Sequence, residues 1–550
     1  MTPTRSGRLL TAAMLAGVLM TGVALIRAAT AWGARGQAAI IQDGRILSDP
    51  AGYLARFRAL GASTVRVVVL WDHVAPQPEA RRMPSGFEGG DPDSYPDSGW
   101  APYDRVVTEA ARDGITLEFT ITGGAPLWAE GARIAPPGAS HHFAWKPNAR
   151  LFGQFVHAVG ERYSGRFTPA SSSTPLPAVH FWSLWNEPNF GQDLGPQAID
   201  GSSVSVAPGM YRRLLDAGWS ALHNTGHGRD KILIGGFAAQ GLSHRPSKRF
   251  PQGLPGNYGQ TKPLKFVHTL YCLDDSYHRL RGRYAQARGC PATAAASRRF
   301  RAQNPGLFKA GGVADHPYPG GLSPLGGAHT DPSYAGFPQL GRLERTLDRV
   351  NRAYGSRTRY QIYSDEFGYI TRPPQTAPYV SPAQAAYYLN WTEYLSWRSP
   401  RVASYAQYLL DDPPPTAGQA GFASGLLTAS DHPKATYYAY RLPLFLPRTA
   451  LRRGKAGVVW GDVRPARFMQ LDTGATQTVQ IQLQAHRRGR FRTLRTVPVT
   501  DPRGYLYLRM AFPESGNARL AYTYPAADAL LPLHLLGTTV YSRIVRLDVR

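Results

Sequence analysis

Eight short β-rich runs, separated by helical patterns, constrain the fold of this 550-residue chain more than any other feature of its sequence. Several of the runs are almost continuously apolar, as expected of strands that are buried on both faces. The runs cover residues 36–42, 63–71, 115–123, 178–185, 231–236, 311–318, 359–368 and 402–410. Strands that alternate with helices form parallel β-α-β units, so eight of them in about 400 residues predict an α/β fold, a (β/α)8 TIM barrel with long loops.

The segments between these runs carry apolar residues three and four positions apart, which is the pattern of an amphipathic helix. The first such segment, 49–61, begins with Asp49 as a helix cap and ends at Gly61. Comparable patterns occupy residues 102–114, 149–165, 209–226, 340–355 and 381–397. Helices between successive strands are what the barrel requires.

The pattern changes after about residue 445, where apolar and polar residues alternate in runs that turn residues separate. The runs cover residues 456–471, 477–486, 490–500 and 504–513. We therefore predict a barrel over residues 36–445, followed by a small antiparallel β-sandwich domain over residues 446–550. Because Trp460 is the only tryptophan of this second region, we expect the sandwich to pack on the barrel rather than to bind glycan.

The first 31 residues predict a secretory signal peptide. Arg5 and Arg8 form a charged leader, residues 9–26 are largely apolar, and Ala29-Thr30-Ala31 is a small-x-small cleavage site. The apolar run is also long enough for an uncleaved membrane anchor. We therefore expect the protein to be secreted or anchored at the outer face of the membrane.

The chain is basic, with 62 Lys and Arg against 37 Asp and Glu and a formal net charge of +25. Such a charge permits binding to polyanions, but the basic residues are scattered and no zinc-finger, RNA-binding or basic-zipper pattern supports nucleic acid as a partner. No glycine-rich nucleotide motif is present, so we predict no cofactor and no metal. The two cysteines, Cys272 and Cys290, predict one disulfide in an exported chain.

Function in such a barrel is expected at the carboxyl ends of the strands. Glu187 follows the fourth predicted strand and Glu366 lies in the seventh, so the two glutamates are expected to face each other across the mouth of the barrel. A facing pair of carboxyl groups, one protonated and one ionised, is what glycoside hydrolysis requires. Asp365 is a rival to Glu366, but adjacent residues of a strand point to opposite faces, so only one of them faces the mouth.

Two motifs carry a resemblance to a known group of enzymes. WNEPN at 185–189 and SDEFGY at 364–369 resemble the acid/base and nucleophile motifs of clan A glycoside hydrolases, and among these the cellulase-like family 5 and the xylosidase/iduronidase-like family 39. The resemblance covers roughly residues 37–440. It implies a retaining mechanism with Glu187 as general acid/base and Glu366 as nucleophile.

The resemblance also implies roles for residues around the pair. Asn186 is expected to hydrogen-bond the sugar 2-hydroxyl, Arg66 to orient the nucleophile, and His316 and Tyr318 to line the subsite where the bond breaks. On physical grounds we expect Arg66 to keep Glu366 ionised, and the apolar faces of Trp128 and Trp185 to raise the pKa of Glu187. Trp71 and Trp128 are also candidates to be exposed near the mouth and to stack on sugar rings, with core or loop packing as the alternative for Trp71.

The leading prediction is thus a secreted retaining glycoside hydrolase whose partner is a carbohydrate substrate. The alternative is a catalytically inactive carbohydrate-binding or polyanion-binding surface protein on the same barrel. The sequence leaves open the sugar, the choice between families 5 and 39, and the choice between endo and exo action. A closed pocket would indicate exo action, and an open groove would indicate endo action.

Overall fold

The computed structural model describes residues 36–131, 144–198, 204–241, 256–326, 331–376, 379–414 and 421–550. The expected signal peptide, residues 1–31, lies outside the described residues. In the part of the chain that is described, no helix is both long enough and apolar enough to cross a membrane.

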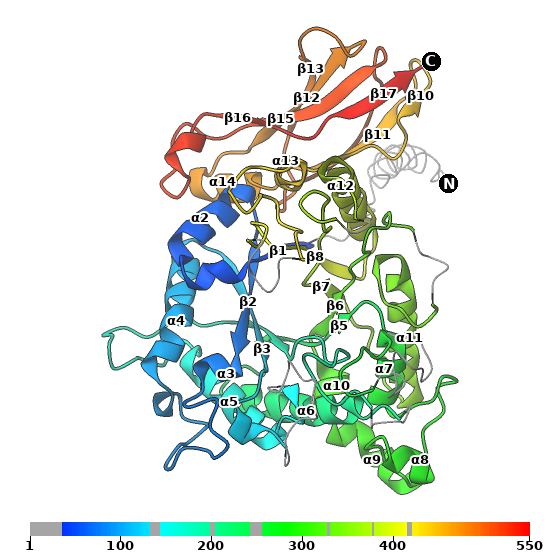
Figure 1. The fold of residues 1–550 in the computed structure, drawn as a ribbon. Helices are drawn as coiled ribbons and strands as arrows, with labels where there is room; N and C mark the ends of the chain where they lie inside the picture. Colours follow the sequence, from blue (N-terminus) through cyan, green and yellow to red (C-terminus); the bar gives the residue numbers. More distant parts are fainter. Residues whose placement is uncertain are drawn as a thin grey trace, which may run out of the picture.

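Eight strands form a closed barrel in the order of the sequence, from β1 to β8 (Figure 1). Every neighbouring pair is parallel, and β8 returns to β1 with Ala406 opposite Ile40. The strands are β1 Ala38–Gln42, β2 Thr64–Leu70, β3 Thr116–Thr122, β4 Phe181–Leu184, β5 Lys231–Ala238, β6 Gly312–His316, β7 Ile362–Ser364 and β8 Val402–Tyr408. Seven of the eight runs read from the sequence contain their barrel strand, β5 extends two residues beyond the predicted run 231–236, and the predicted TIM barrel is confirmed.

The main helices lie between the strands, as their periodicity predicted. Asp49 caps the first of them by accepting a hydrogen bond from the backbone of Gly52, and Gly61 ends it with a positive φ of 80°. These helices are α2 Pro50–Leu60, α4 Asp97–Arg112, α5 Ala149–Arg162, α6 Ala207–Asn224, α11 Leu340–Ala353 and α12 Pro382–Arg398.

Shorter elements occupy the loops. The long connection between β5 and β6 holds four short helices and the disulfide between Cys272 and Cys290, which confirms the predicted cysteine pairing. The remaining helices are α3 Trp71–Val74, α7 Pro263–Leu270, α8 Gly282–Gln286, α9 Ala294–Gln303, α10 Pro305–Lys309 and α13 Ala435–Arg441. The 3-10 turns are η1 Gly44–Leu47, η2 Pro92–Ser94, η3 Leu127–Ala129, η5 Phe337–Gln339 and η6 Leu533–Leu535.

The C-terminal region forms two sheets, one with the order β10-β17-β15-β12-β13 plus β16 on β15, and one with the order β14-β11-β9. Its strands are β9 Leu444–Phe445, β10 Ala450–Leu451, β11 Gly457–Asp462, β12 Thr478–Ala485, β13 Arg492–Pro498, β14 Tyr505–Met510, β15 Gly516–Thr523, β16 Thr539–Tyr541 and β17 Val545–Val549. Two details of the prediction were wrong. The second half of the run 456–471 is helix α14 (Ala466–Thr473), and β10 pairs with β17 in parallel.

The two C-terminal sheets lie beside α2 and α12 of the barrel (Figure 1). Trp460 is fully buried in a cluster with aromatic residues of α12. Arg464 makes a bidentate contact of 2.7 Å with Glu393 of α12, and both side chains are 1% exposed. At Gly61 a Cβ atom would lie 2.2 Å from the backbone of Arg464, so no larger residue fits this close approach. The C-terminal region is thus packed tightly on the barrel.

Candidate active site

Glu187 and Glu366 come together at the carboxyl end of the barrel, as the sequence predicted. Glu187 lies three residues beyond β4 and Glu366 two residues beyond β7. One carboxylate oxygen of each lies within 4.8 Å of the other, and the side chains are 17% and 14% exposed. The backbone at Trp185 and Glu187 has positive φ values of 73° and 36°, a strained conformation of the kind that concentrates at functional sites.

Arg66 links the two strands that carry the pair. Arg66 lies on β2, and its side chain is 1% exposed. Its Nη1 lies 2.7 Å from Oε2 of Glu366. A second nitrogen donates to Oδ1 of Asn186 at 2.7 Å, and the third donates to Thr120 on β3 at 3.0 Å. Gln42, at the end of β1, also accepts a hydrogen bond from Arg66. The fork of Arg66 therefore fixes the position of Glu366 relative to four other strands of the barrel.

Glu366 is held as a carboxylate by its neighbours. Burial opposes its ionisation, yet the charges of His316 and Arg66 lower the pKa of the Glu366 carboxyl below its usual range. The hydroxyl of Tyr318 donates to Oε1 over 2.9 Å, so both oxygens of this group accept hydrogen bonds. An ionised carboxylate with both oxygens fixed is suited to attack on a carbon centre.

His316, the last residue of β6, lies between the two glutamates. Its Nδ1 is 2.9 Å from Oε1 of Glu187 and 3.8 Å from Oε2 of Glu366, and the ring is fully buried. Burial opposes its protonation, but the charges of Glu366 and Asp365 and the bond to Glu187 raise the pKa of His316 to about 9. The surroundings therefore favour the protonated ring, and one histidine contacts both carboxyl groups.

Asn186 is held in one orientation by two partners. Its Oδ1 accepts from Arg66, and its Nδ2 donates to Oδ1 of Asp193 at 3.0 Å. Burial and the charge of Glu187 raise the pKa of the Asp193 carboxyl well above its usual range. Asp193 had not been singled out in the sequence, because it lies in a loop six residues after Glu187 with no motif around it.

Asp365, the rival carboxylate, lies beneath the site. Its side chain is fully buried, with Oδ2 3.4 Å from Nε of Arg66 and Oδ1 3.6 Å from Nε2 of His316. Glu118 and Asp315 are buried in the same part of the barrel, where desolvation raises the pKa of both carboxyl groups well above the usual range. Just beyond β7, Asp365 thus points inward and Glu366 lies at the mouth, as expected of adjacent residues that point to opposite faces.

The expectation that Trp71 and Trp128 offer exposed faces near the mouth was wrong. Trp71 begins helix α3 rather than ending the strand, is 1% exposed, and stacks on Phe155. Trp128 packs edge-on against Trp71, and its indole nitrogen donates to the carbonyl of Pro76. Both rings form an aromatic core under the loops, because apolar area of this size is more stable when neighbouring helices cover it.

The surroundings expected for Glu187 also differ from the prediction. Trp185 is fully buried, and its indole nitrogen donates to the carbonyl of Asp193. The contact that the structure gives to the Glu187 carboxyl is the charged ring of His316 rather than an apolar tryptophan face.

A cleft extends to both sides of the glutamate pair. One cavity of about 600 Å³ and another of about 740 Å³ share Glu187, Glu366, Asp193 and Tyr408 among their lining residues. Further lining residues include Gln42, Arg45, Gly123, Phe190, Tyr379 and Phe422. Gln42 and Tyr408 end β1 and β8. The rule that polar strand ends line the mouth therefore also applies to β1 and β8.

Glu187, His316 and Glu366 offer three ligand atoms close enough together to hold a metal ion. The hydrogen bonds of Glu366 argue against such a role, since Arg66 and Tyr318, which are not metal ligands, occupy both of its oxygens. Two buried cations in this network already balance the carboxylates.

No protein-family model and no curated protein matches the sequence. Similar solved structures include a family 39 glycoside hydrolase from the gut symbiont Bacteroides cellulosilyticus WH2, with 16% identity over 88% of this chain and 80% of that chain and a TM-score of 0.46. Others are a glucosidase from Croceicoccus marinus (11% identity, 88% and 94% coverage, TM-score 0.45) and a family 1 β-glucosidase from Thermotoga maritima (16% identity, 72% and 86% coverage, TM-score 0.44). These structures are glycoside hydrolases, the class that the two motifs resemble. At such identities and TM-scores the likeness assigns neither a substrate nor a reaction to this chain.

Proposed function

We propose that the protein is a retaining glycoside hydrolase that cleaves an O-glycosidic bond by double displacement. The separation of the two carboxyl groups carries this proposal, since their nearest oxygens lie within 4.8 Å of each other. Retaining enzymes hold their carboxyl groups about 5 Å apart, whereas inverting enzymes need ~6.5–9.5 Å to admit a water between carboxylate and sugar.

Glu366 is the nucleophile in this mechanism. The fork of Arg66 and the hydroxyl of Tyr318 keep it ionised and aimed into the cleft. One of its oxygens attacks the anomeric carbon as the bond to the leaving oxygen breaks, which gives a glycosyl-enzyme ester. Water then attacks the same carbon, releases the sugar and restores the carboxylate.

Glu187 is the general acid in the first step and the general base in the second. It transfers its proton to the leaving oxygen and so becomes a carboxylate beside the imidazolium of His316, whose Nδ1 lies 2.9 Å from Oε1. That contact stabilises the charge that develops on Glu187. In the second step Glu187 takes a proton from the attacking water.

The cleft supports a glycan that extends in both directions from the bond that is cleaved. The two cavities meet at the glutamate pair, so sugar residues fit on either side of it. Asn186, held between Arg66 and Asp193, is placed to bind the 2-hydroxyl of the sugar that reacts. Tyr408 and Phe422, whose ring centroids lie 5.2 Å apart, replace Trp71 and Trp128 as the aromatic surface for sugar binding.

We further propose that the enzyme is exported and works outside the cytoplasm, with residues 1–31 as its signal. The disulfide between Cys272 and Cys290 supports this, because disulfides persist in oxidising compartments. In the same proposal, residues 446–550 are a packing domain that buries Trp460 and stabilises the barrel through α2 and α12.

The test is an activity screen of the mature chain, from about Trp32, on aryl glycosides and polysaccharides, with Glu187→Ala and Glu366→Ala beside it. We expect both variants to lose turnover, and product analysis by NMR to show the same anomeric configuration as the substrate. A substrate with an activated leaving group needs no acid, so Glu187→Ala should still form the glycosyl-enzyme, which intact-mass measurement detects. Glu366→Ala should not form it.

Glu130→Gln is the matched control, because this carboxyl is also partly buried in a loop beyond a barrel strand, and its hydrogen bond within the described residues comes from the backbone of Trp145 rather than from the catalytic network. It should retain activity. Turnover that survives both Glu187→Ala and Glu366→Ala would overturn the assignment of the site. Glycan binding without turnover across the panel would instead support the inactive carbohydrate-binding alternative.

A further inference from the structure

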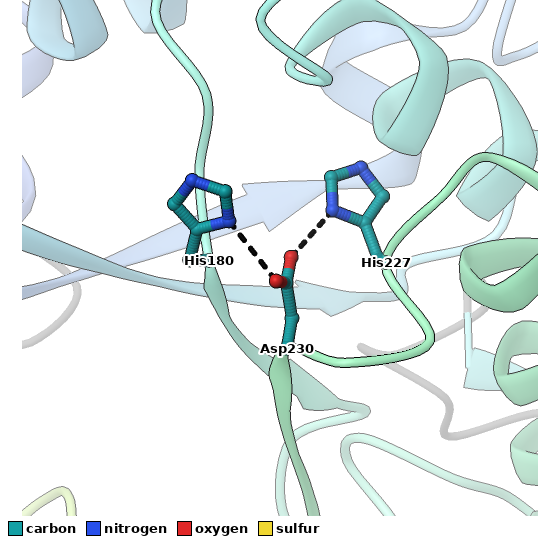
Figure 2. Close-up of side chains that lie close together, drawn as sticks. All are labelled: His180, His227 and Asp230. Carbon is teal, nitrogen blue, oxygen red and sulfur yellow. Dashed lines mark hydrogen bonds and ion pairs between the residues drawn. The ribbon is translucent and has the colours of Figure 1, made fainter.

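A second cluster of potential ligands lies at the opposite end of the barrel from the cleft. His180 immediately precedes β4, and His227 and Asp230 lie in the turn that precedes β5. Figure 2 shows the two imidazole rings on either side of the Asp230 carboxylate, each with a ring nitrogen directed at one of its oxygens. One atom from each of the three residues lies within 4.8 Å of the others. The mechanism proposed above uses none of them.

His227 turns a different ring nitrogen to each of two oxygen atoms, those of Gly160 and Asp230. Nε2 of His227 lies 2.9 Å from the carbonyl oxygen of Gly160, which can only accept, so this nitrogen carries a hydrogen. In the neutral ring Nδ1 is then a lone-pair donor, and it lies 2.6 Å from Oδ2 of Asp230. Nδ1 of His227 and an oxygen of Asp230 are thus turned toward each other, as two ligands of one metal ion are.

The surroundings favour a metal ion. His180 presents its Nδ1 to the other oxygen of Asp230 at 3.0 Å, so two imidazoles and one carboxylate converge. Neighbouring groups also orient the ligands. The carbonyl of Gly160 accepts a hydrogen bond from the ring of His227, and Trp182 donates to Oδ2 of Asp230 at 3.2 Å. Histidine ligands of metals are commonly oriented by a carbonyl in this way.

The cluster is both anchored and accessible. His227 is 4% exposed and its ring packs edge-on against Trp182. The backbone of Lys231 donates to the carbonyl of His180, which ties the turn to the start of β4. His180 is 70% exposed, so solvent reaches the open side and the ring is free to adjust. A tetrahedral zinc site with bonds of about 2.0–2.1 Å separates its ligand atoms by about 3.3 Å, so the 2.6 Å contact between His227 and Asp230 must lengthen by roughly 0.7 Å when the ion binds.

From this geometry we infer that His180, His227 and Asp230 form a binding site for a divalent first-row transition metal, best suited to Zn²⁺, with water as the fourth ligand. Imidazole nitrogen selects this class, whereas Mg²⁺ and Ca²⁺ prefer all-oxygen sites. The ion cross-links the turn before β5 to the start of β4 and thereby stabilises the base of the barrel.

Calorimetric titration of the tag-free, chelator-treated chain with ZnCl₂ near pH 7.5 tests the site. We expect one ion per chain at this site, and an affinity at least tenfold weaker in His180→Ala. This side chain is largely exposed, so the variant is expected to fold. His278→Ala is the matched control, because His278 is an 81% exposed histidine 3.6 Å from a carboxylate, that of Asp274, with no third ligand in the candidate metal clusters of the described residues. Its affinity should equal that of the wild type.

Repeating the titration on Glu366→Gln distinguishes Zn²⁺ binding at this site from Zn²⁺ binding in the catalytic cleft. This variant should still bind Zn²⁺ at His180, His227 and Asp230. Co²⁺ in place of Zn²⁺ should give the visible absorption of a tetrahedral ion in the wild type, and His180→Ala should lose it. Equal Zn²⁺ affinity in the wild type and His180→Ala would overturn the inference. So would equal competition by Mg²⁺, or the absence of Zn²⁺ binding, in which case the contact holds a proton only.

Discussion

His316 places its Nδ1 2.9 Å from Oε1 of Glu187, and the same nitrogen lies 3.8 Å from Oε2 of Glu366. The two carboxyl groups therefore share one buried histidine, whereas Arg66 contacts Glu366 alone of the two. Because the ring is fully buried, its charge is little screened by solvent, and the protonation of His316 controls both the charge balance of the site and part of the stability of the barrel.

His316→Gln tests this role through stability. The folded protein raises the pKa of His316 to about 9, above the value of about 6.5 expected in the unfolded chain. The stabilisation is therefore fully present below pH 6.5 and is lost as the pH rises through 9. We expect the difference in unfolding free energy between wild type and His316→Gln to shrink by about 3 kcal/mol between pH 6 and pH 10. Denaturant unfolding at several pH values measures it.

His486→Gln provides the comparison for His316, because His486 is 75% exposed and pairs only with Glu514. Its effect on the unfolding free energy should be small across the same pH range. A His316→Gln difference that stays constant from pH 6 to pH 10 would contradict the charged histidine.

Tyr318→Phe removes the hydroxyl that donates to Oε1 of Glu366 at 2.9 Å. A hydrogen bond to a charged group contributes about 1.5–3 kcal/mol, so we expect a loss of roughly 10- to 100-fold in kcat/KM on an aryl glycoside. The acid limb of the pH profile should also move to higher pH, because the carboxylate loses a donor.

Tyr163→Phe is the control for Tyr318→Phe, since this buried hydroxyl likewise donates to a carboxylate, that of Asp104, at 2.9 Å, but lies between α5 and α4. It should lower the melting temperature without changing the pH profile. An identical effect of the two substitutions on activity would show that Tyr318 acts through stability alone.

Arg66→Met removes the cation that fixes Glu366. Its charge helps to lower the pKa of that carboxyl, and an opposite charge at contact distance typically lowers a carboxyl pKa by about 1–3 units. We expect the acid limb of kcat/KM to rise by about that amount, and the chain to lose about 3–5 kcal/mol of stability, as is usual when one partner of a buried pair is removed. Arg66→Lys keeps the charge but loses the fork, so its shift should be smaller.

Arg464→Met distinguishes the effect of Arg66 on the pKa of Glu366 from the general loss of stability that Arg66→Met also causes. Arg464 is as buried as Arg66 and makes a bidentate contact with Glu393, but it lies between the barrel and the C-terminal sheets. The stability loss should be comparable and the acid limb unchanged. If Arg464→Met moves the acid limb as far as Arg66→Met does, the shift reports general loosening of the fold.

The fold could be predicted because its elements are set by local patterns. The buried parallel strands are short apolar runs, and caps such as Asp49 and Gly61 mark where a helix starts and stops. The prediction failed where tertiary contacts decide, as at residues 466–473. There a run that alternates weakly becomes α14, whose Phe468 and Met469 are buried.

The sequence predicts a site residue only where the end of a strand or a motif marks its position. The positions of five site residues follow from their places on or just beyond β2, β4, β6 and β7, because a closed parallel barrel brings every carboxyl end to one mouth. These residues are Arg66, Glu187, His316, Tyr318 and Glu366. The exposure of a side chain has no such local signal. Trp71 and Trp128 are covered by α5 and by the loop around Phe87, which are distant in sequence. The partnership of Asn186 with Asp193 likewise depends on how a loop folds back.

Glu118→Gln tests the buried acids beneath the site. Burial and the charge of Asp365 raise the pKa of Glu118 well above its usual range, so the folded chain retains this proton after the unfolded chain has released it. Stability therefore falls as the pH rises from the unfolded pKa, about 4.3, toward the folded one. Glutamine is neutral and nearly isosteric, so Glu118→Gln should gain stability relative to the wild type between pH 5 and pH 8. Glu161→Gln, at a side chain that is 50% exposed, should show no such trend. Denaturant unfolding across this range decides the matter, because a Glu118→Gln variant that is least stable at pH 8 would mean that Glu118 is ionised and paired inside the barrel.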